Sequence, residues 1–282
     1  MDKFNLHNIL KNHPRAESLT IREKLVKGFK KGIVATAGLI AHGRGECFDY
    51  LLGEKTQPFA FEAEKVAVAT LLLSSNPVIS VNGNTAALCA REVVKLSKLV
   101  NAKVEVNLFY RSLKREKLIA KTLRRYGLSK VLGVGGKADK TIPSISSLRC
   151  KVDSEGIFSA DTVLLAIEDG DRTSALRKAG KRVIAIDLNP FSRTAIWASI
   201  TIVDNLVRAL PNMIRFAEAL RKKDRKDLEG IVESYNNDNM LKEAVRFINL
   251  RLKNLCKEKV FGWSICGEEF QRMFLEKEAL SR

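Results

Sequence analysis

The sequence predicts an α/β protein with a doubly wound, mostly parallel sheet, helices on both faces and a helical C-terminal extension. Three short apolar runs rich in β-branched residues support this: Thr162–Ile167, Arg182–Ile186 and Ile200–Val203. Each is too short for a typical helix, so each predicts a buried strand. Arg172–Gly180, between the first two, has the length and closing glycine of a helix. This order predicts parallel pairing, because a parallel crossover needs a helix-sized connection.

The same alternation extends upstream and supplies the rest of the sheet. Apolar runs and amphipathic segments take turns from residue 60 onward. The predicted strands are Pro77–Val81, Val104–Phe109 and Val131–Val134, and the predicted helices are Phe61–Ser75, Ala86–Val100 and Lys114–Tyr126. Strands that alternate with helices in this way are typical of a parallel sheet covered on both faces.

Polar side chains follow the last three predicted strands. Glu168–Asp171 comes after the first, Asp187–Asn189 after the second and Asp204–Asn205 after the third. Ligands in parallel sheets bind beyond the carboxyl ends of the strands. These segments are therefore expected to form one wall of a small-molecule site.

The glycine-rich segment 31–53 departs from any regular pattern. Gly32, Gly38, Gly43 and Gly45 predict a loop in which the backbone approaches a ligand closely. Arg44, between two of these glycines, suits a bidentate grip on phosphate or carboxylate. The neighbouring His42 is equally consistent with a hydrogen-bonded core histidine and with a role near the site.

The chain is expected to divide into a catalytic domain, residues 1–211, and a helical extension, residues 212–282. Helices are predicted over Phe4–Leu10 and Glu17–Gly28 at the start of the chain and over Arg215–Lys226 and Leu241–Val260 in the extension. The amphipathic pattern of the last helix is typical of core packing or of a dimer contact. We expect the extension to pack on the domain or on a dimer partner.

Composition limits the class of protein. The net charge is +17, and residues 1–211 hold 34 Lys and Arg against 20 Asp and Glu. Such a charge favours small polyanions or nucleic acid as partners, or reflects a thermophile-like surface without a partner. Five scattered cysteines without a paired motif, and no apolar run long enough to cross a bilayer, predict a cytoplasmic protein that does not bind membranes.

Several long motifs are shared with one family. They are His13-Pro-Arg-Ala-Glu-Ser-Leu19, Gly38-Leu-Ile-Ala-His-Gly-Arg-Gly-Glu46, Phe48-Asp-Tyr-Leu-Leu-Gly-Glu54, Pro77-Val-Ile-Ser-Val-Asn-Gly-Asn84, Val106-Asn-Leu-Phe109, Glu168-Asp-Gly-Asp-Arg-Thr173, Ile186-Asp-Leu-Asn-Pro190, Ser192-Arg-Thr-Ala195 and Ile200-Thr-Ile-Val-Asp-Asn205. In these the chain resembles the archaeal phosphopantothenate synthetase family, the 4-phosphopantoate–β-alanine ligases. The resemblance covers residues 10 to 255, with Cys47 as a departure from the expected small or apolar residue.

The resemblance implies a Rossmann-like homodimer with ligase activity. ATP, 4-phosphopantoate and β-alanine would give 4′-phosphopantothenate, AMP and diphosphate through an acyl-adenylate, with Mg²⁺, as a step of coenzyme A biosynthesis. The ATP contacts that the resemblance implies are Arg22, Arg44, Asp187, Leu188, Asn189, Arg193, Thr194, Asn205 and Leu206. The polyanionic substrates would also explain the basic domain without nucleic acid.

The predicted catalytic residues are Arg44, His42 and Asp171. With Arg44, three further arginines are expected to offset the substrate anions: Arg15, Arg22 and Arg193. Glu168, Asp169 or Asp171 could bind the β-alanine ammonium group or a metal ion, and the sequence alone leaves the metal ligands unknown.

Two other functions remain open at this stage. One is a different nucleotide-binding enzyme of the same fold, although the segment Gly133–Lys137 lacks the spacing of a phosphate-binding loop. The other is a basic nucleic-acid-binding protein, although zinc-knuckle and helix-turn-helix signatures are missing and aromatic residues make up only 7% of the chain, few for base stacking.

Overall fold

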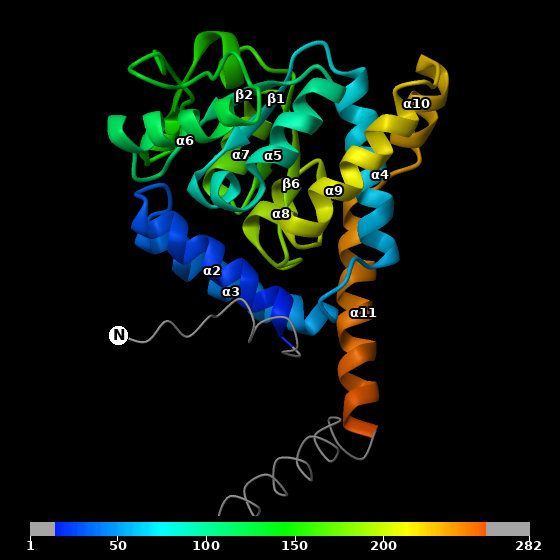
Figure 1. The fold of residues 1–282 in the computed structure, drawn as a ribbon. Helices are drawn as coiled ribbons and strands as arrows, with labels where there is room; N and C mark the ends of the chain where they lie inside the picture. Colours follow the sequence, from blue (N-terminus) through cyan, green and yellow to red (C-terminus); the bar gives the residue numbers. More distant parts are fainter. Residues whose placement is uncertain (1–14, 258–282) are drawn as a thin grey trace, which may run out of the picture.

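A single parallel sheet organises the protein (Figure 1). The structure is a computed structural model that describes residues 15–257. Five strands pair in the order β2-β1-β5-β6-β7, and every pairing is parallel. The strands are β1 (Pro77–Val81), β2 (Lys103–Val106), β5 (Thr162–Ala166), β6 (Arg182–Ile186) and β7 (Ile200–Ile202). The doubly wound parallel sheet predicted from the sequence is confirmed.

The strand order places a crevice between β1 and β5. Counted along the chain, the five strands lie in the order 2-1-3-4-5, one of the common doubly wound orders. The chain leaves β1 toward β2 on one side, whereas the later strands add on the other side through β5. Connections on either side of β1 and β5 therefore diverge above their carboxyl ends. Ligands bind at this switch point in open α/β sheets.

Apolar side chains of the sheet alternate between two cores, one on each face. Val163 and Leu165 pack on one side, whereas Leu164 and Ala166 pack on the other. One face is covered by α4 (Pro58–Leu73), α5 (Gly83–Leu99), α6 (Leu113–Arg125) and α9 (Leu206–Leu220), and the other by α7 (Gly170–Lys178) and the short helix Ser154–Phe158. Period-two alternation in buried strands gives both faces an apolar surface, so both need helices.

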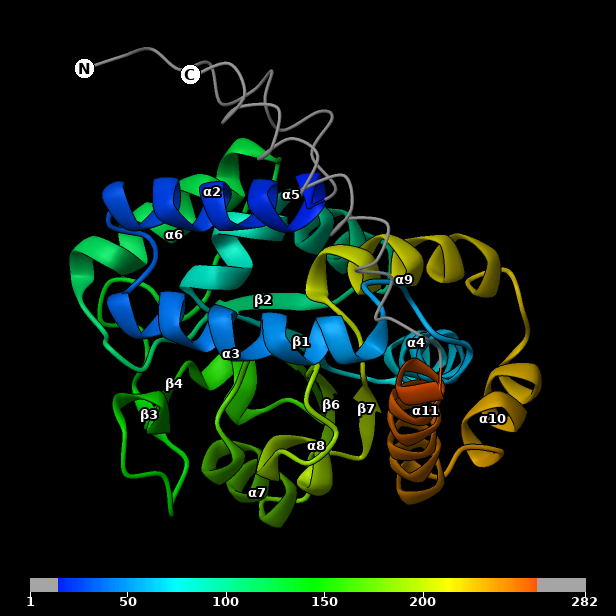
Figure 2. The ribbon, with the colours of Figure 1, turned by 90° about the horizontal axis from the view of Figure 1, so that it is seen from below.

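Two N-terminal helices and one long C-terminal helix surround this sandwich. In Figure 2, α3 (Thr36–Leu52) crosses the ends of the strands, and α2 (Ala16–Lys30) lies beside it. The last described helix, α11 (Asn237–Lys257), packs on α3 and α4 and then extends away from the body (Figure 1). In the same region α10 (Arg225–Glu233) packs on α4.

The loop predicted for residues 31–53 is wrong, because most of this segment is helix α3. Gly53, with φ of 84°, ends the helix in the left-handed conformation. Gly38 acts through its missing side chain instead. A Cβ atom at Gly38 would lie 2.2 Å from Asn84 Oδ1, so only a glycine lets α3 approach the start of α5 this closely. Gly38 does mark a close approach, but the approach is between two helices and not between a loop and a ligand.

Two glycines of α3 give a matched test of that contact. Gly38→Ala is expected to lower the free energy of unfolding by about 1–3 kcal/mol, because the new methyl group would overlap the Asn84 side chain. Gly43→Ala in the same helix meets nothing within 4 Å. It is expected to stabilise the protein by about 0.5–1 kcal/mol. Urea unfolding of both variants measures the difference, and equal effects would contradict the close-approach role.

Other element boundaries differ from those predicted. Residues Val131–Val134 form only a single parallel bridge, between Leu132 and Glu105. The helix predicted to begin at Arg215 begins at Leu206, because Asn205 caps it and its apolar face packs on α4 and α5. The proposed division after residue 211 thus falls inside α9 and stays a prediction. The predicted helix Phe4–Leu10 lies outside the described residues.

Candidate functional site

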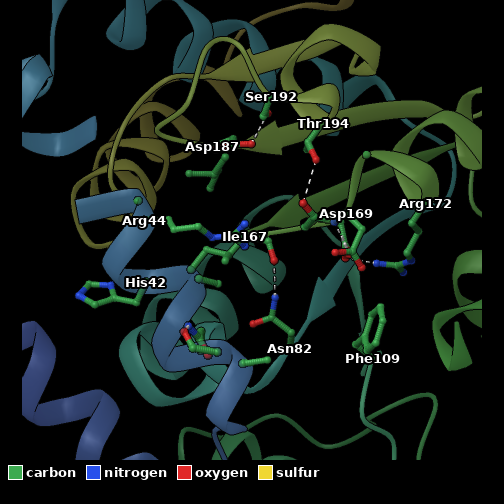
Figure 3. A pocket seen from close by; sticks show the side chains of 18 of the residues that line it. His42, Arg44, Asn82, Phe109, Ile167, Asp169, Arg172, Asp187, Ser192 and Thr194 are labelled. Carbon is green, nitrogen blue, oxygen red and sulfur yellow. Dashed lines mark hydrogen bonds and ion pairs between the residues drawn. The ribbon is translucent and has the colours of Figure 1, made fainter. Parts of the chain in front are cut away.

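A cavity of about 940 Å³ lies between α3 and the carboxyl edge of the sheet (Figure 3). Its walls come from α3, from the segments that follow each of the five strands, and from the connection around residues 145–149. Arg44 extends from α3 toward Ile167, above the ends of the strands (Figure 3). The cavity therefore occupies the switch point at which this sheet order is expected to bind a ligand.

Most of the site residues expected from the sequence line this cavity. They are His42, Arg44, Glu168, Asp169, Asp171, Asp187, Leu188, Asn189, Arg193, Thr194, Asn205 and Leu206. Arg22 and Arg15 are not among the lining residues. Arg22 instead makes a bidentate ion pair with Glu46 of α3, with Nη2 2.8 Å from Oε2, and Arg15 donates to Tyr50 at 2.7 Å.

The turn after β5 is held in an unusual conformation. Ile167 has φ of +53°, a conformation that a β-branched residue rarely adopts. Asn82, at the end of β1, holds this turn from the neighbouring strand: its Nδ2 donates to the carbonyl oxygens of Ala166 (2.8 Å) and Ile167 (3.2 Å). The same side chain caps α5 by accepting from the Thr85 amide. Strained backbone of this kind clusters at functional sites.

A buried cluster of charges lies directly behind the turn. The side chain of Glu168 is almost fully buried and forms ion pairs with Arg149 and Arg172. Arg172 is also fully buried and donates twice to Ser80 of β1 at 3.2 Å. Burial lowers the pKa of each arginine to about 10, which still leaves both positive at neutral pH. Asp169 projects from this cluster with Oδ2 3.4 Å from Arg149 Nε.

The segment after β6 orders a second set of polar groups. Asp187 accepts from the amide of Asn189 at 3.0 Å and from the Ser192 hydroxyl. Burial raises the pKa of the Asp187 carboxyl. Ser192 also caps the short helix α8 (Arg193–Trp197), and the Thr194 hydroxyl donates to the carbonyl oxygen of Glu168 at 2.8 Å. These contacts join the ends of β5 and β6 into one surface.

A third set of polar contacts joins the end of β7 to α3. Asn205 Nδ2 donates to Asp49 at 2.8 Å, and Arg208 bridges Asp49 and Asp204. Asp204 also accepts from the Thr56 hydroxyl at 2.6 Å. The network is buried, so Asp204 and Asn205 reach the cavity with most of their hydrogen bonds already made.

His42 has a different orientation from Arg44. Its side chain extends from the other side of α3 (Figure 3), where the charges of Glu46 and Arg22 act on it. Burial lowers the pKa of the His42 imidazole, so the neutral form predominates at neutral pH. Its Nε2 is buried without a hydrogen-bond partner in the described part of the chain.

Residues on the β1 and β2 side of the cavity were not singled out from the sequence. Besides Arg149 and Arg172, they include Asn82, Asn84, Phe109 and Arg115. Arg115 donates to the carbonyl oxygens of Ile33 (3.0 Å) and Tyr110, and it lies beside Gly83 at the start of α5. The turn Asn82-Gly-Asn84 between strand and helix was the available signal for this side.

Comparison with known proteins gives the same family as the motifs. The model of the phosphopantothenate/pantothenate synthetase family matches residues 59–251. The chain belongs to the phosphopantothenate/pantothenate synthetase family. Curated relatives include a 4-phosphopantoate–β-alanine ligase of Thermococcus kodakarensis, 49% identical over 90% of this chain and 97% of the relative. A 4-phosphopantoate–β-alanine ligase of Methanosarcina mazei is 49% identical over 88% of this chain and 96% of the relative.

The resemblance to the synthetase family is therefore confirmed. A third relative, of Thermococcus onnurineus, carries the same name and is 50% identical over 88% of this chain and 95% of its own length. The agreement covers nearly all of each relative, so the family assignment applies to the sheet, the cavity and α11 together. Within residues 15–257, no helix of this family member is long and apolar enough to cross a membrane.

Proposed function

We propose that the protein is a 4-phosphopantoate–β-alanine ligase that works through an acyl-adenylate. The observation that carries this proposal is the cavity at the switch point, which is lined by residues from every family motif quoted above except His13–Leu19. Relatives that carry the ligase name align along almost the whole chain. We further propose ATP as the activating nucleotide.

The β6 and β7 side of the cavity suits the nucleotide. Asp187 and Asn189 lie at the end of β6, where polar side chains contact ribose or base in nucleotide-binding folds. Arg44 and Arg193 approach from α3 and α8 and can offset the charge of a triphosphate. Asp171, paired with Arg193 at the cavity wall, would hold the Mg²⁺ ion, which needs only one or two protein carboxylates when it binds together with substrate phosphates. The ATP contact of Arg22, which lies outside the cavity, stays a prediction.

The β1 and β2 side suits the phosphate of 4-phosphopantoate. Gly83 and Asn84, the first residues of α5, line the cavity, and backbone amides at a helix N-terminus attract anions. Arg115 lies beside Gly83, with Nη2 3.0 Å from the position that a Cβ atom would take. A guanidinium next to free helix amides is the chemistry that binds a phosphate monoester.

The reaction then needs alignment and charge stabilisation more than a nucleophilic side chain. A carboxylate oxygen of 4-phosphopantoate attacks the α-phosphorus of ATP, the bond to the β-phosphate oxygen breaks, and diphosphate leaves. The nitrogen of β-alanine then attacks the acyl carbon, a C–N bond forms, and AMP leaves with the electrons of the broken C–O bond. The amine loses two protons in total as the ammonium ion becomes an amide.

A product assay tests the proposal. Purified protein with ATP, Mg²⁺, 4-phosphopantoate and β-alanine should release AMP and diphosphate and form 4′-phosphopantothenate. AMP release should depend on 4-phosphopantoate. Formation of ADP and phosphate would overturn the adenylate step and indicate an acyl phosphate. If no nucleotide were consumed, the ligase proposal would fail and the basic surface would have to be tested against nucleic acid.

We also propose a homodimer. Exposed apolar side chains lie on two helices: Ile196 and Trp197 on α8, and Leu250 and Leu252 in the second half of α11. Apolar surface of this kind marks protein–protein contacts when it is contiguous. Light scattering coupled to size-exclusion chromatography should give twice the 31.5 kDa chain mass, and a monomer at all concentrations would contradict the proposal.

A further inference from the structure

We infer that the Asp169–Arg149 pair is the binding site for the zwitterion of β-alanine, with the ammonium group on Asp169 and the carboxylate on Arg149. This inference rests on the proposed ligase function and names the subsite for its third substrate. The pair lies in the cavity between the two sides assigned above to the nucleotide and to 4-phosphopantoate. A neutral zwitterion can replace a protein ion pair head to tail without changing the net charge of the site.

Of the carboxylates that line the cavity, Asp169 has the most unused capacity for hydrogen bonds and ion pairs. Within residues 15–257, the cavity is lined by five carboxylates: Glu168, Asp169, Asp171, Asp187 and Asp204. Four of them have close ion-pair or hydrogen-bond partners. Glu168 pairs with Arg149 and Arg172, and Asp171 pairs with Arg193. Asp187 accepts from Ser192 and the Asn189 amide, and Asp204 contacts Arg208 and Thr56.

The contacts of Asp169 itself are weaker. The carboxylate of Asp169 has only the 3.4 Å contact with Arg149 in the same described region, and its side chain is 46% exposed. Asp169 is the N-cap residue of α7, but its side chain makes no capping hydrogen bond. An incoming ammonium ion therefore has to displace only the 3.4 Å contact between Asp169 and Arg149.

Arg149 complements it from the buried side. Its side chain is only 9% exposed, and it directs Nη1 to Glu168 and Nε to Asp169. No side-chain nitrogen of Arg149 donates a hydrogen bond to another described residue, and Nε and Nη1 are buried, although Arg149 lines the cavity. A buried guanidinium with unused hydrogen-bond donors is a strong binding group for a carboxylate, because little water competes for it.

The backbone around Asp169 is held in place from two neighbouring strands. Asn82 and Arg172 are the positioning residues: Asn82 holds the left-handed Ile167, and Arg172 holds Glu168. Glu168 in turn accepts from the amide of Asp169 at 2.9 Å. The acidic side chain is thus presented from a turn anchored on two strands, and its position does not depend on a flexible loop.

The test separates the two half-reactions. In Asp169→Asn, the KM for β-alanine is expected to rise at least about tenfold, because one charge-assisted contact is lost. The 4-phosphopantoate-dependent exchange of labelled diphosphate into ATP, which needs no β-alanine, should stay within about threefold of wild type. Asp171→Asn should show the reverse pattern, with a weaker response to ATP and Mg²⁺ and an unchanged KM for β-alanine. Glu155→Gln, which removes an exposed carboxylate remote from the cavity, controls for net charge.

Hydroxylamine supplies an independent readout. It is mostly uncharged at neutral pH and needs no carboxylate to bind, so Asp169→Asn should form hydroxamate from the acyl-adenylate at close to the wild-type rate. An unchanged KM for β-alanine, or equal loss of exchange and of amide formation, would overturn the inference. These failures differ from failure of the proposed function, in which the wild-type protein itself would show neither exchange nor 4′-phosphopantothenate.

Discussion

Arg172→Met is expected to lower the free energy of unfolding by about 3–5 kcal/mol. Arg172 donates charge-assisted hydrogen bonds inside a buried cluster, and leaving their buried partners short of a donor costs more than an apolar replacement gains. Here Glu168 would keep Arg149 but lose Arg172, and Ser80 would lose the donor that it now shares. Urea unfolding at neutral pH measures the effect.

Arg225→Met is the matched control for this variant. Arg225 also pairs with a glutamate four residues away, at 2.8 Å from Glu229, but the two side chains are 76% and 44% exposed. Exposed pairs contribute no more than about 1 kcal/mol. Similar losses in the two variants would show that the Arg172 contacts are screened like surface pairs, contrary to their burial.

Glu64→Gln is expected to stabilise the protein, and more strongly as the pH rises. Glu64 is fully buried in α4, and burial, reinforced by the charge of Asp204, raises its pKa to about 9. A raised folded-state pKa means that stability is fully present below the ordinary carboxyl value and is lost as the pH rises through about 9. Glutamine keeps the neutral state and can still accept from Asn212. The expected gain is on the order of 3 kcal/mol at pH 8.

Thermal unfolding between pH 4 and pH 9 measures this prediction. Wild type should lose stability along the range, whereas Glu64→Gln should show a flatter profile and should match wild type near pH 4. Glu62→Gln on the same helix is the control: Glu62 is 53% exposed beside Lys65, and its replacement should change little. Parallel profiles for wild type and Glu64→Gln would contradict a buried, protonated carboxyl group.

The sheet could be predicted from the sequence because its strands are short, β-branched and buried on both faces. Pro77–Val81 and Arg182–Ile186 were predicted with the bounds that the structure shows. The loop prediction for residues 31–53 was wrong because glycines lower helix propensity. Only the tertiary contact of Gly38 with Asn84 explains why a glycine stands inside this helix. Local patterns do not contain that contact.

The site was predictable to the extent that it follows the strands. Asp187 and Asn189 lie where the strand-end rule places them, and the family motifs brought in Arg44 from α3. Arg149 was missed because it comes from an irregular connection, and Arg172 because a charged residue on a short helix is usually exposed. Their burial depends on partners far away in the chain, which periodicity does not reveal.

The cavity walls draw on the chain from residue 35 to residue 206, and this has a consequence for folding. Neighbouring strands β1 and β5 are far apart in sequence, so their pairing closes a long loop and delays the formation of native contacts. A nascent chain or a proteolytic fragment that lacks β6 and β7 would hold only part of the walls. Catalytic competence should therefore return during refolding only with the last long-range contacts, and enzyme activity should serve as a late kinetic probe of assembly.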